Sequence, residues 1–124
     1  MKPAHHFNVI LVTAPDVRTA RQLAHGALEQ RLAACASLVP KIESHYWWQG
    51  KITRGAEILI LFKTARSRLA ALEQYILASH PYDTPEIVAL RLDQGTARYL
   101  AWINASIATP TSACAQAARA GGTG

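Results

Sequence analysis

The sequence has 124 residues, of which 50% are hydrophobic and 17% charged, with a formal net charge of +5. This length predicts one domain with a well-developed core. The lysines and arginines are scattered without a block of like charge, which favours a solvated surface over a nucleic-acid-binding face. The two cysteines do not form a disulfide scaffold, and no stretch is long and apolar enough to span a membrane.

The two ends of the chain differ in composition from the middle. The N-terminus lacks the apolar stretch and cleavage site of a signal peptide, so we expect a cytoplasmic protein. We expect residues 1–6 to be flexible and residues 7–108 to form a single domain. Residues 109–124 are mostly Ala, Gly, Ser, Thr and Pro, and they predict a disordered tail.

The first half of the domain predicts a strand over residues 7–13 and then a helix. Asp16 is placed to cap that helix, which is predicted to end near residues 33–35. Gly26 lies inside the helix, where glycine costs about 1 kcal/mol relative to alanine. Such a glycine indicates close packing against a neighbour.

A long hairpin is predicted over residues 36–64. Gln49 and Gly50 form its turn, Pro40 marks a bend, and Gly55 is a candidate bulge position. The second arm contains an unbroken apolar run at residues 58–62. A strand of this kind needs cover on both of its faces.

The second half of the domain predicts a helix, a stiff loop, a strand and a last helix. Ser67 or Thr64 is the candidate cap of the first of these helices, which ends before Pro81. The loop covers residues 80–85, the strand residues 86–92, and the short helix follows residues 94–96. It carries Tyr99 and Leu100 on one side.

The predicted order is therefore β-α-β-β-α-β with a C-terminal helix, which is an α+β fold of the ferredoxin-like type. Two helices cover only one face of such a sheet. Because the strands at 7–13, 58–62 and 86–92 are apolar on both faces, the sequence predicts an oligomer in which sheets pack against sheets.

Several short motifs occur in register along residues 7–107. They are TAPD at 13–16, LAAC at 32–35, SHYWWQGK at 44–51, KT at 63–64, HPYDTPE at 80–86 and YLAWI at 99–103. In this order and spacing the sequence resembles the CutA family of divalent-ion-tolerance proteins. The resemblance implies a ferredoxin-like subunit, a homotrimer related in architecture to the PII signalling proteins, and a link to copper and other divalent cations.

Cys35 and His80 are the first candidates for metal ligands, because copper favours thiolate and imidazole. In family members credited with copper binding, a cysteine precedes the TAPD motif and a second histidine precedes the HPY motif. Val12 and Ser79 occupy those positions here, which removes two soft ligands. The alternative is that Cys35 is a small buried hydrophobe and that His80 caps a helix C-terminus.

The family motifs also imply that Glu57, Lys63, Tyr82 and Glu86 line a cleft between subunits. A lysine beside carboxylates can bind a small anion or a metal with its counter-charge, and the alternative is an ordinary interface ion pair.

Aromatic side chains gather next to the hairpin turn. Neighbouring residues on a strand point to opposite faces, so Tyr46, Trp47 and Trp48 are predicted to lie at the trimer interface rather than to form a ligand platform.

The sequence contains no serine elbow and no phosphate-binding glycine loop, so we expect no catalysis. Two hypotheses remain. In the first, the protein is a divalent-cation tolerance protein that binds copper or another divalent cation weakly. In the second, it is a PII-like trimeric scaffold that binds a small molecule or partner protein in its inter-subunit clefts. Binding of RNA is disfavoured, because the aromatics lie by the hairpin turn and not on the central strands.

Overall fold

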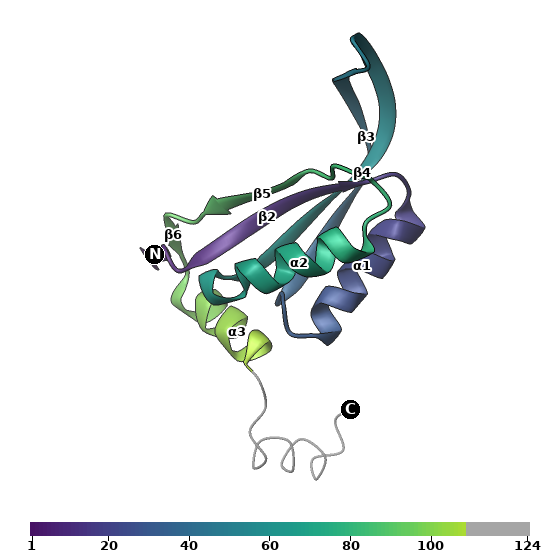
Figure 1. Cartoon of the computed structure of the whole chain (residues 1–124). Coiled ribbons are helices and arrows are strands. Elements are labelled where there is room, and N and C mark those ends of the chain that lie inside the picture. The colour runs from purple at the N-terminus through teal and green to yellow at the C-terminus, as the bar shows by residue number, and fades with distance from the viewer. Residues whose placement is uncertain (109–124) are drawn as a thin grey trace.

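The computed structural model describes residues 1–108, and the predicted tail at 109–124 lies outside them. A four-stranded antiparallel sheet is covered by helices on one face, and a long hairpin projects from it (Figure 1). The domain consists of β2 (Phe7–Ala14), α1 (Val17–Glu29), β3 (Cys35–Trp48), β4 (Lys51–Ala65), η1 (Arg66–Arg68), α2 (Leu69–Ser79), β5 (Ile87–Arg91) and α3 (Ala97–Ile107).

The strand order β3-β4-β2-β5 confirms the predicted ferredoxin-like α+β fold. Helices α1 and α2 lie together against one face of the sheet (Figure 1). The side chains between them and the sheet form the main core. Its largest fully buried members are Phe62, Leu23, Ile60, Leu72, Ile76 and Val12.

The other face of the sheet carries apolar side chains that point away from α1 and α2. The strand register aligns Leu61 with Leu11 and Ser37, and Leu11 with Val88, so these residues share that face. We call it the open face. Its apolar members are Val9, Leu11, Val39, Leu59, Leu61, Val88 and Leu90. At the β5 edge Val88 is 47% and Leu90 53% exposed, as expected for a surface that needs a partner.

Helix α3 covers one end of this same face. Phe7 and Ala65 are paired in the register and continue the row of Val9 and Lys63. They pack with Leu100 of α3 in a small second core. The open face is therefore bounded by α3 at one end and by the hairpin at the other.

The N-terminal residues, which were predicted to be flexible, are attached to the domain. β1 (Lys2–Pro3) pairs with β6 (Gln94–Gly95), and Ala4 is buried. The backbone N–H of Ala4 donates to the carbonyl of Asp93. Truncation of this segment would therefore disturb the domain.

The hairpin turn is as predicted, whereas the bulge is not at Gly55. Gln49 and Gly50 both have a positive φ, as a tight two-residue hairpin requires. Gly55 pairs regularly with Ser44, and the irregularity lies between Val39 and Ile42. The Pro40 ring removes a ladder donor there, and Lys41 at φ 57° turns the strand.

The helix ends also differ in part from the prediction. The Asp16 side chain caps α1 as predicted, accepting from the Thr19 N–H at 2.7 Å. However, α1 ends at Glu29 rather than near residues 33–35, because Arg31 adopts a left-handed φ of 59°. Neither Ser67 nor Thr64 caps α2, which instead continues from the 3₁₀ turn of η1.

Gly26 lies against Tyr75 of α2, which confirms close packing at this point. A Cβ at position 26 would lie 1.8 Å from the Tyr75 hydroxyl oxygen. That hydroxyl donates to the Gln22 carbonyl at 3.2 Å and so joins α2 to α1. An alanine at position 26 would therefore displace the Tyr75 ring.

Gly26→Ala is expected to lower the free energy of unfolding by about 1–2 kcal/mol, because Tyr75 must leave its bond and its packing. In a Tyr75→Ala background the same change is expected to raise it by about 1 kcal/mol through helix propensity. Urea denaturation of the four proteins measures both values. Stabilisation by Gly26→Ala in the wild-type background would contradict the packing argument.

Candidate functional site

The loop after α2 forms a compact polar site at the base of the hairpin. Helix α2 ends at Ser79 because Pro81 disfavours a helical conformation at His80. The His80 backbone is extended there, while its N–H still donates to the Ile76 carbonyl at 2.8 Å. The imidazole is thereby directed to the end of β2, where it is buried.

Both ring nitrogens of His80 are engaged by the backbone. The Tyr82 N–H donates to Nδ1 at 3.0 Å, so Nδ1 is an acceptor and carries no proton. Nε2 therefore carries the proton and donates to the Thr13 carbonyl at 2.7 Å. In this state neither nitrogen has a free lone pair for a metal, and a cation could bind only by replacing one of these bonds.

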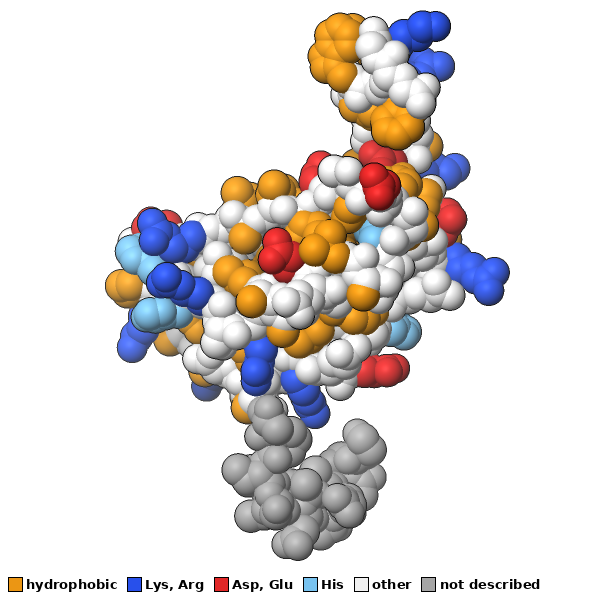
Figure 2. All heavy atoms as spheres, viewed as in Figure 1, with side chains coloured by type: hydrophobic (Ala, Val, Ile, Leu, Met, Phe, Trp, Pro, Cys, Tyr) orange, Lys and Arg blue, Asp and Glu red, His pale blue; other side chains and the backbone are white. Residues whose placement is uncertain are grey.

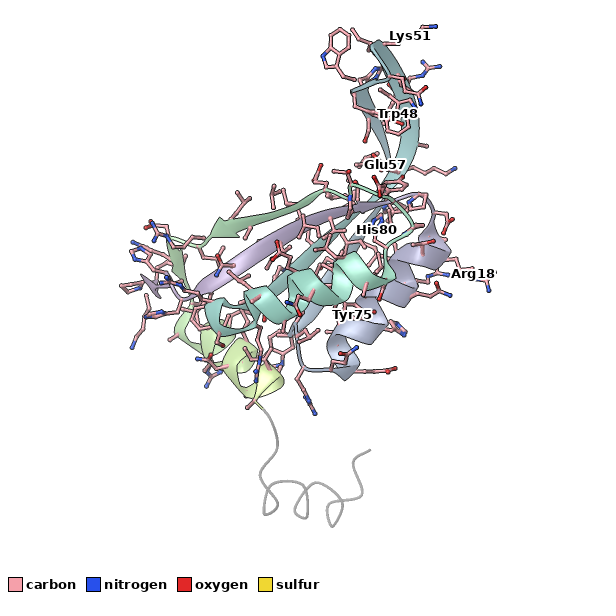
Figure 3. All side chains as sticks on the ribbon, in the orientation of Figure 1. Arg18, Trp48, Lys51, Glu57, Tyr75 and His80 are labelled. Atoms are coloured by element: carbon pink, nitrogen blue, oxygen red, sulfur yellow. The ribbon has the colours of Figure 1, made fainter. Side chains whose placement is uncertain are left out.

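Tyr82 joins the His80 loop to the hairpin. Its ring lies 4.7 Å from the His80 ring, and its hydroxyl donates to a Glu57 carboxylate oxygen at 3.0 Å. Figure 3 shows Glu57 at the base of the hairpin, next to His80. Burial, together with the hydrogen bond to Glu57 and its charge, raises the pKa of Tyr82 to about 12.

This pKa predicts a loss of stability in strong alkali. The unfolded tyrosine titrates near pH 10 and the folded one near 12, so the folded state binds this proton more tightly. The contribution is complete below pH 10 and is lost as the pH rises from 10 to 12. In a tyrosinate absorbance titration, the difference between wild type and Tyr82→Phe should therefore have its midpoint near 12. A midpoint near 10 would contradict the site.

The structure brings together only part of the predicted cleft. Glu57 and Tyr82 are in contact, whereas Lys63 lies further along β4, roughly 20 Å from Glu57 at the rise of a strand. The Lys63 ammonium instead lies over the ring of Tyr99, 5.6 Å from its centroid. Glu86 is exposed just before β5. Within one subunit, Glu57 and Tyr82 thus form a pair, while Lys63 and Glu86 lie apart from it.

The two predicted metal ligands also lie apart. Cys35 pairs with Lys63, while His80 reaches Thr13, which pairs with Leu59. Positions 59 and 63 of β4 are roughly 13 Å apart. Cys35 is a free, half-buried thiol, and its sulfur lies 3.8 Å from the Ser37 hydroxyl oxygen. Within residues 1–108 no group of three or more His, Cys, Asp and Glu side chains converges on one point.

The end of the hairpin exposes apolar side chains. Trp47 is 74% exposed, and its register partner Ile52, on the same face, is 68% exposed. Trp48, which points the other way, is 60% exposed, and Tyr46 shares its face. Figure 2 shows the projecting arm with orange side chains on its outer surface. This arm remains the predicted interface with another copy.

The sequence did not reveal two features of the site. The Thr13 carbonyl, which holds His80, belongs to the backbone and has no residue signature. Tyr99 and Trp102 form a stacked pair with ring centroids 5.6 Å apart, beside Lys63. Their i, i+3 spacing was a readable signal, because such residues are neighbours on a helix.

These observations define a class of protein: a ferredoxin-like domain with a projecting hairpin, an open apolar sheet face and a His–Tyr–Glu network at the hairpin base. A sequence model of the family CutA1 divalent ion tolerance protein matches residues 8–106. The chain belongs to this family. No helix in residues 1–108 is long and apolar enough to cross a membrane.

Individual relatives agree with the family match. The chain is 46% identical to the divalent-cation tolerance protein CutA of Pectobacterium atrosepticum over 99 residues, 80% of this chain and 90% of that protein. It is 43% identical over 98 residues, 79% of this chain, to Protein CutA 1, chloroplastic, of Oryza sativa subsp. japonica, of which it spans 55%. The structure of CutA from Synechococcus elongatus PCC7942 matches with a TM-score of 0.82 at 37% identity, over 86% of this chain and 94% of that one.

Proposed function

We propose that this chain forms a homotrimer that binds divalent cations, copper most tightly, and acts in cation tolerance without catalysis. The observation that carries the proposal is the open face, whose apolar side chains need to be covered by another apolar surface. Cover by sheets of other copies would bury it, and a trimer is the assembly that the resemblance to the CutA family implies. The family name supplies the link to divalent cations.

Assembly also bears on the composition of a metal site. No set of three ligands converges within residues 1–108 of one chain, so a tight site would need side chains from more than one copy. Cys35 lies on the same face as Leu61, because its partner Lys63 does, and neighbouring copies would approach it there. It is therefore our first ligand candidate. His80 is the second, provided that a metal replaces one of its backbone hydrogen bonds.

Calorimetric titration with Zn(II) and Cu(II) tests this proposal. The protein should carry His5→Ala and His6→Ala, because these exposed imidazoles bind metals in their own right. Substitution is preferable to truncation, since β1 and Ala4 are part of the fold. We expect saturable binding, tighter for Cu(II) than for Zn(II), that Cys35→Ser weakens at least tenfold.

The matched control is His25→Ala, which removes an exposed imidazole of α1. It should leave the titration unchanged. An equal loss in His25→Ala and Cys35→Ser would indicate adventitious surface binding and would contradict the metal site. Light scattering on the same samples tests the trimer separately.

The second candidate function is that of a PII-like scaffold with a small molecule or partner protein in its inter-subunit clefts. The observation that favours it is the Tyr82–Glu57 hydrogen bond, which places a carboxylate and a phenol at the hairpin base. A trimer that takes up neither metal after the His5 and His6 substitutions would favour this function.

A further inference from the structure

A cavity of about 660 Å³ lies at the end of the sheet farthest from the hairpin turn. Its residues come from the start of β2, the end of β4, η1 and α3. They are His6, Phe7, Ala65, Arg66, Ser67 and Asn104. The volume falls within the range of about 300–1,000 Å³ that is usual for small-molecule sites.

The cavity has an apolar wall and a polar rim that is rich in donors. Phe7 and Ala65 are buried and belong to the small core under α3. Arg66, Ser67 and Asn104 offer guanidinium, hydroxyl and amide donors, and the lining includes no acidic residue. The rim is held in place by the backbone, where the Arg66 N–H donates to the His6 carbonyl at 2.6 Å.

Within residues 1–108, the Arg66 side chain differs from those of Arg31 and Arg68 in its hydrogen bonding. Arg31 and Arg68 donate to the carbonyls of Ser106 and Ile107 at 2.8 and 2.7 Å, and so complete the end of α3. In the part of the chain that the structure describes, the Arg66 guanidinium makes neither a hydrogen bond nor an ion pair. It is exposed at the cavity and available to a ligand.

The surroundings of the cavity are also positive. Lys2 in β1 and Arg91 in β5 lie at the same end of the sheet, and Figure 2 shows basic and histidine side chains gathered at the N-terminal end. Asp93 also lies at this end, with a carboxylate oxygen 3.5 Å from the Nε2 atom of His5. An anion that approaches this end therefore meets mainly cationic groups.

We propose that this cavity binds a small organic anion, with a phosphate or carboxylate head at Arg66, Ser67 and Asn104 and a short apolar body against Phe7. A planar guanidinium binds such oxyanions through two parallel hydrogen bonds. The apolar wall adds affinity for an anion that carries an apolar body. The cavity shares no residue with the ligand candidates Cys35 and His80 or with Glu57.

Amide NMR titration with phenyl phosphate, benzoate and benzyl alcohol at constant ionic strength tests this proposal. The two anions carry the same ring with different heads, and the alcohol is the uncharged comparison. We expect saturable shifts at His6, Ala65–Ser67 and Asn104 with at least one anion. The anion that binds more tightly identifies the head group.

Arg66→Gln should weaken this binding about tenfold, as the loss of a charge-assisted hydrogen bond implies. Arg54→Gln makes the same charge change on the exposed hairpin and should have no effect. The proposal is overturned by an absence of saturable shifts at these residues, by equal weakening in the two variants, or by benzyl alcohol binding as tightly as the anions.

Discussion

Leu61→Lys is expected to convert the proposed trimer into folded monomers. Leu61 lies in the middle of the open face, flanked by Leu11 on β2 and Ser37 on β3. In a monomer the lysine would be exposed to water, so the fold is retained. In an assembly its charge would be buried against apolar side chains, at a cost of several kcal/mol for every subunit.

Light scattering measures the result directly. The mass should fall from about three times 13.5 kDa to 13.5 kDa at micromolar concentration, while the far-UV circular dichroism is unchanged. The control is Leu77→Lys, which makes the same change at an exposed position of α2, away from the open face. A Leu61→Lys protein with the wild-type mass would show that this face is not the interface.

His80→Ala is expected to lower the free energy of unfolding by about 2–4 kcal/mol. The variant loses the bonds to the Thr13 carbonyl and the Tyr82 N–H, leaves that buried carbonyl without its donor, and opens a cavity. Helix α2, β2 and the Tyr82 loop would lose their common contact. Urea denaturation at fixed protein concentration measures the difference.

Two further variants separate the causes of this effect. His80→Phe leaves no cavity, because its ring is somewhat larger than imidazole, but it removes both hydrogen bonds, so it should retain most of the destabilisation. His25→Ala, on the exposed side of α1, should change stability by less than about 0.5 kcal/mol. If His80→Phe were as stable as wild type, the hydrogen bonds of His80 would not be what stabilises the loop.

The stability of His80→Ala also affects how metal titrations are interpreted. If this variant lost metal binding, either a missing ligand or a disturbed loop would explain the loss. Cys35→Ser is the cleaner test, because within residues 1–108 the Cys35 thiol makes a single polar contact, the long one of 3.8 Å with the Ser37 hydroxyl. Because His80 also stabilises the loop, Cys35→Ser is the more informative variant for metal binding.

Local patterns in the sequence were sufficient for the fold. The Asp16 cap, the Gln49–Gly50 turn and the helix end before Pro81 each depend on neighbouring residues, and all three are found in the structure. The bulge was predicted at the wrong place, because a glycine such as Gly55 allows an irregular strand pairing but does not cause one. Pro40 enforces it by removing a donor from the ladder.

The site depended more on tertiary contacts. The family motifs grouped Glu57 and Tyr82 in one cleft, and the strand register together with the loop after α2 gives their contact, a hydrogen bond of 3.0 Å within one subunit. Lys63 was grouped with them across a subunit boundary, and within one subunit its ammonium lies over the ring of Tyr99. Contacts between residues far apart in sequence are fixed by register, which no local pattern specifies.

The sequence by itself therefore determined the order of the elements, the family and the apolar surplus of the sheet, because periodicity and motif spacing are properties of the chain. Tertiary structure decided which groups remain available for function. It occupies both nitrogens of His80 and holds Cys35 apart from it. Among residues 1–108 it leaves the Arg66 guanidinium without a hydrogen-bond partner at a cavity. The reason is physical: a side chain is available to a ligand only when the fold has not already satisfied its hydrogen bonds.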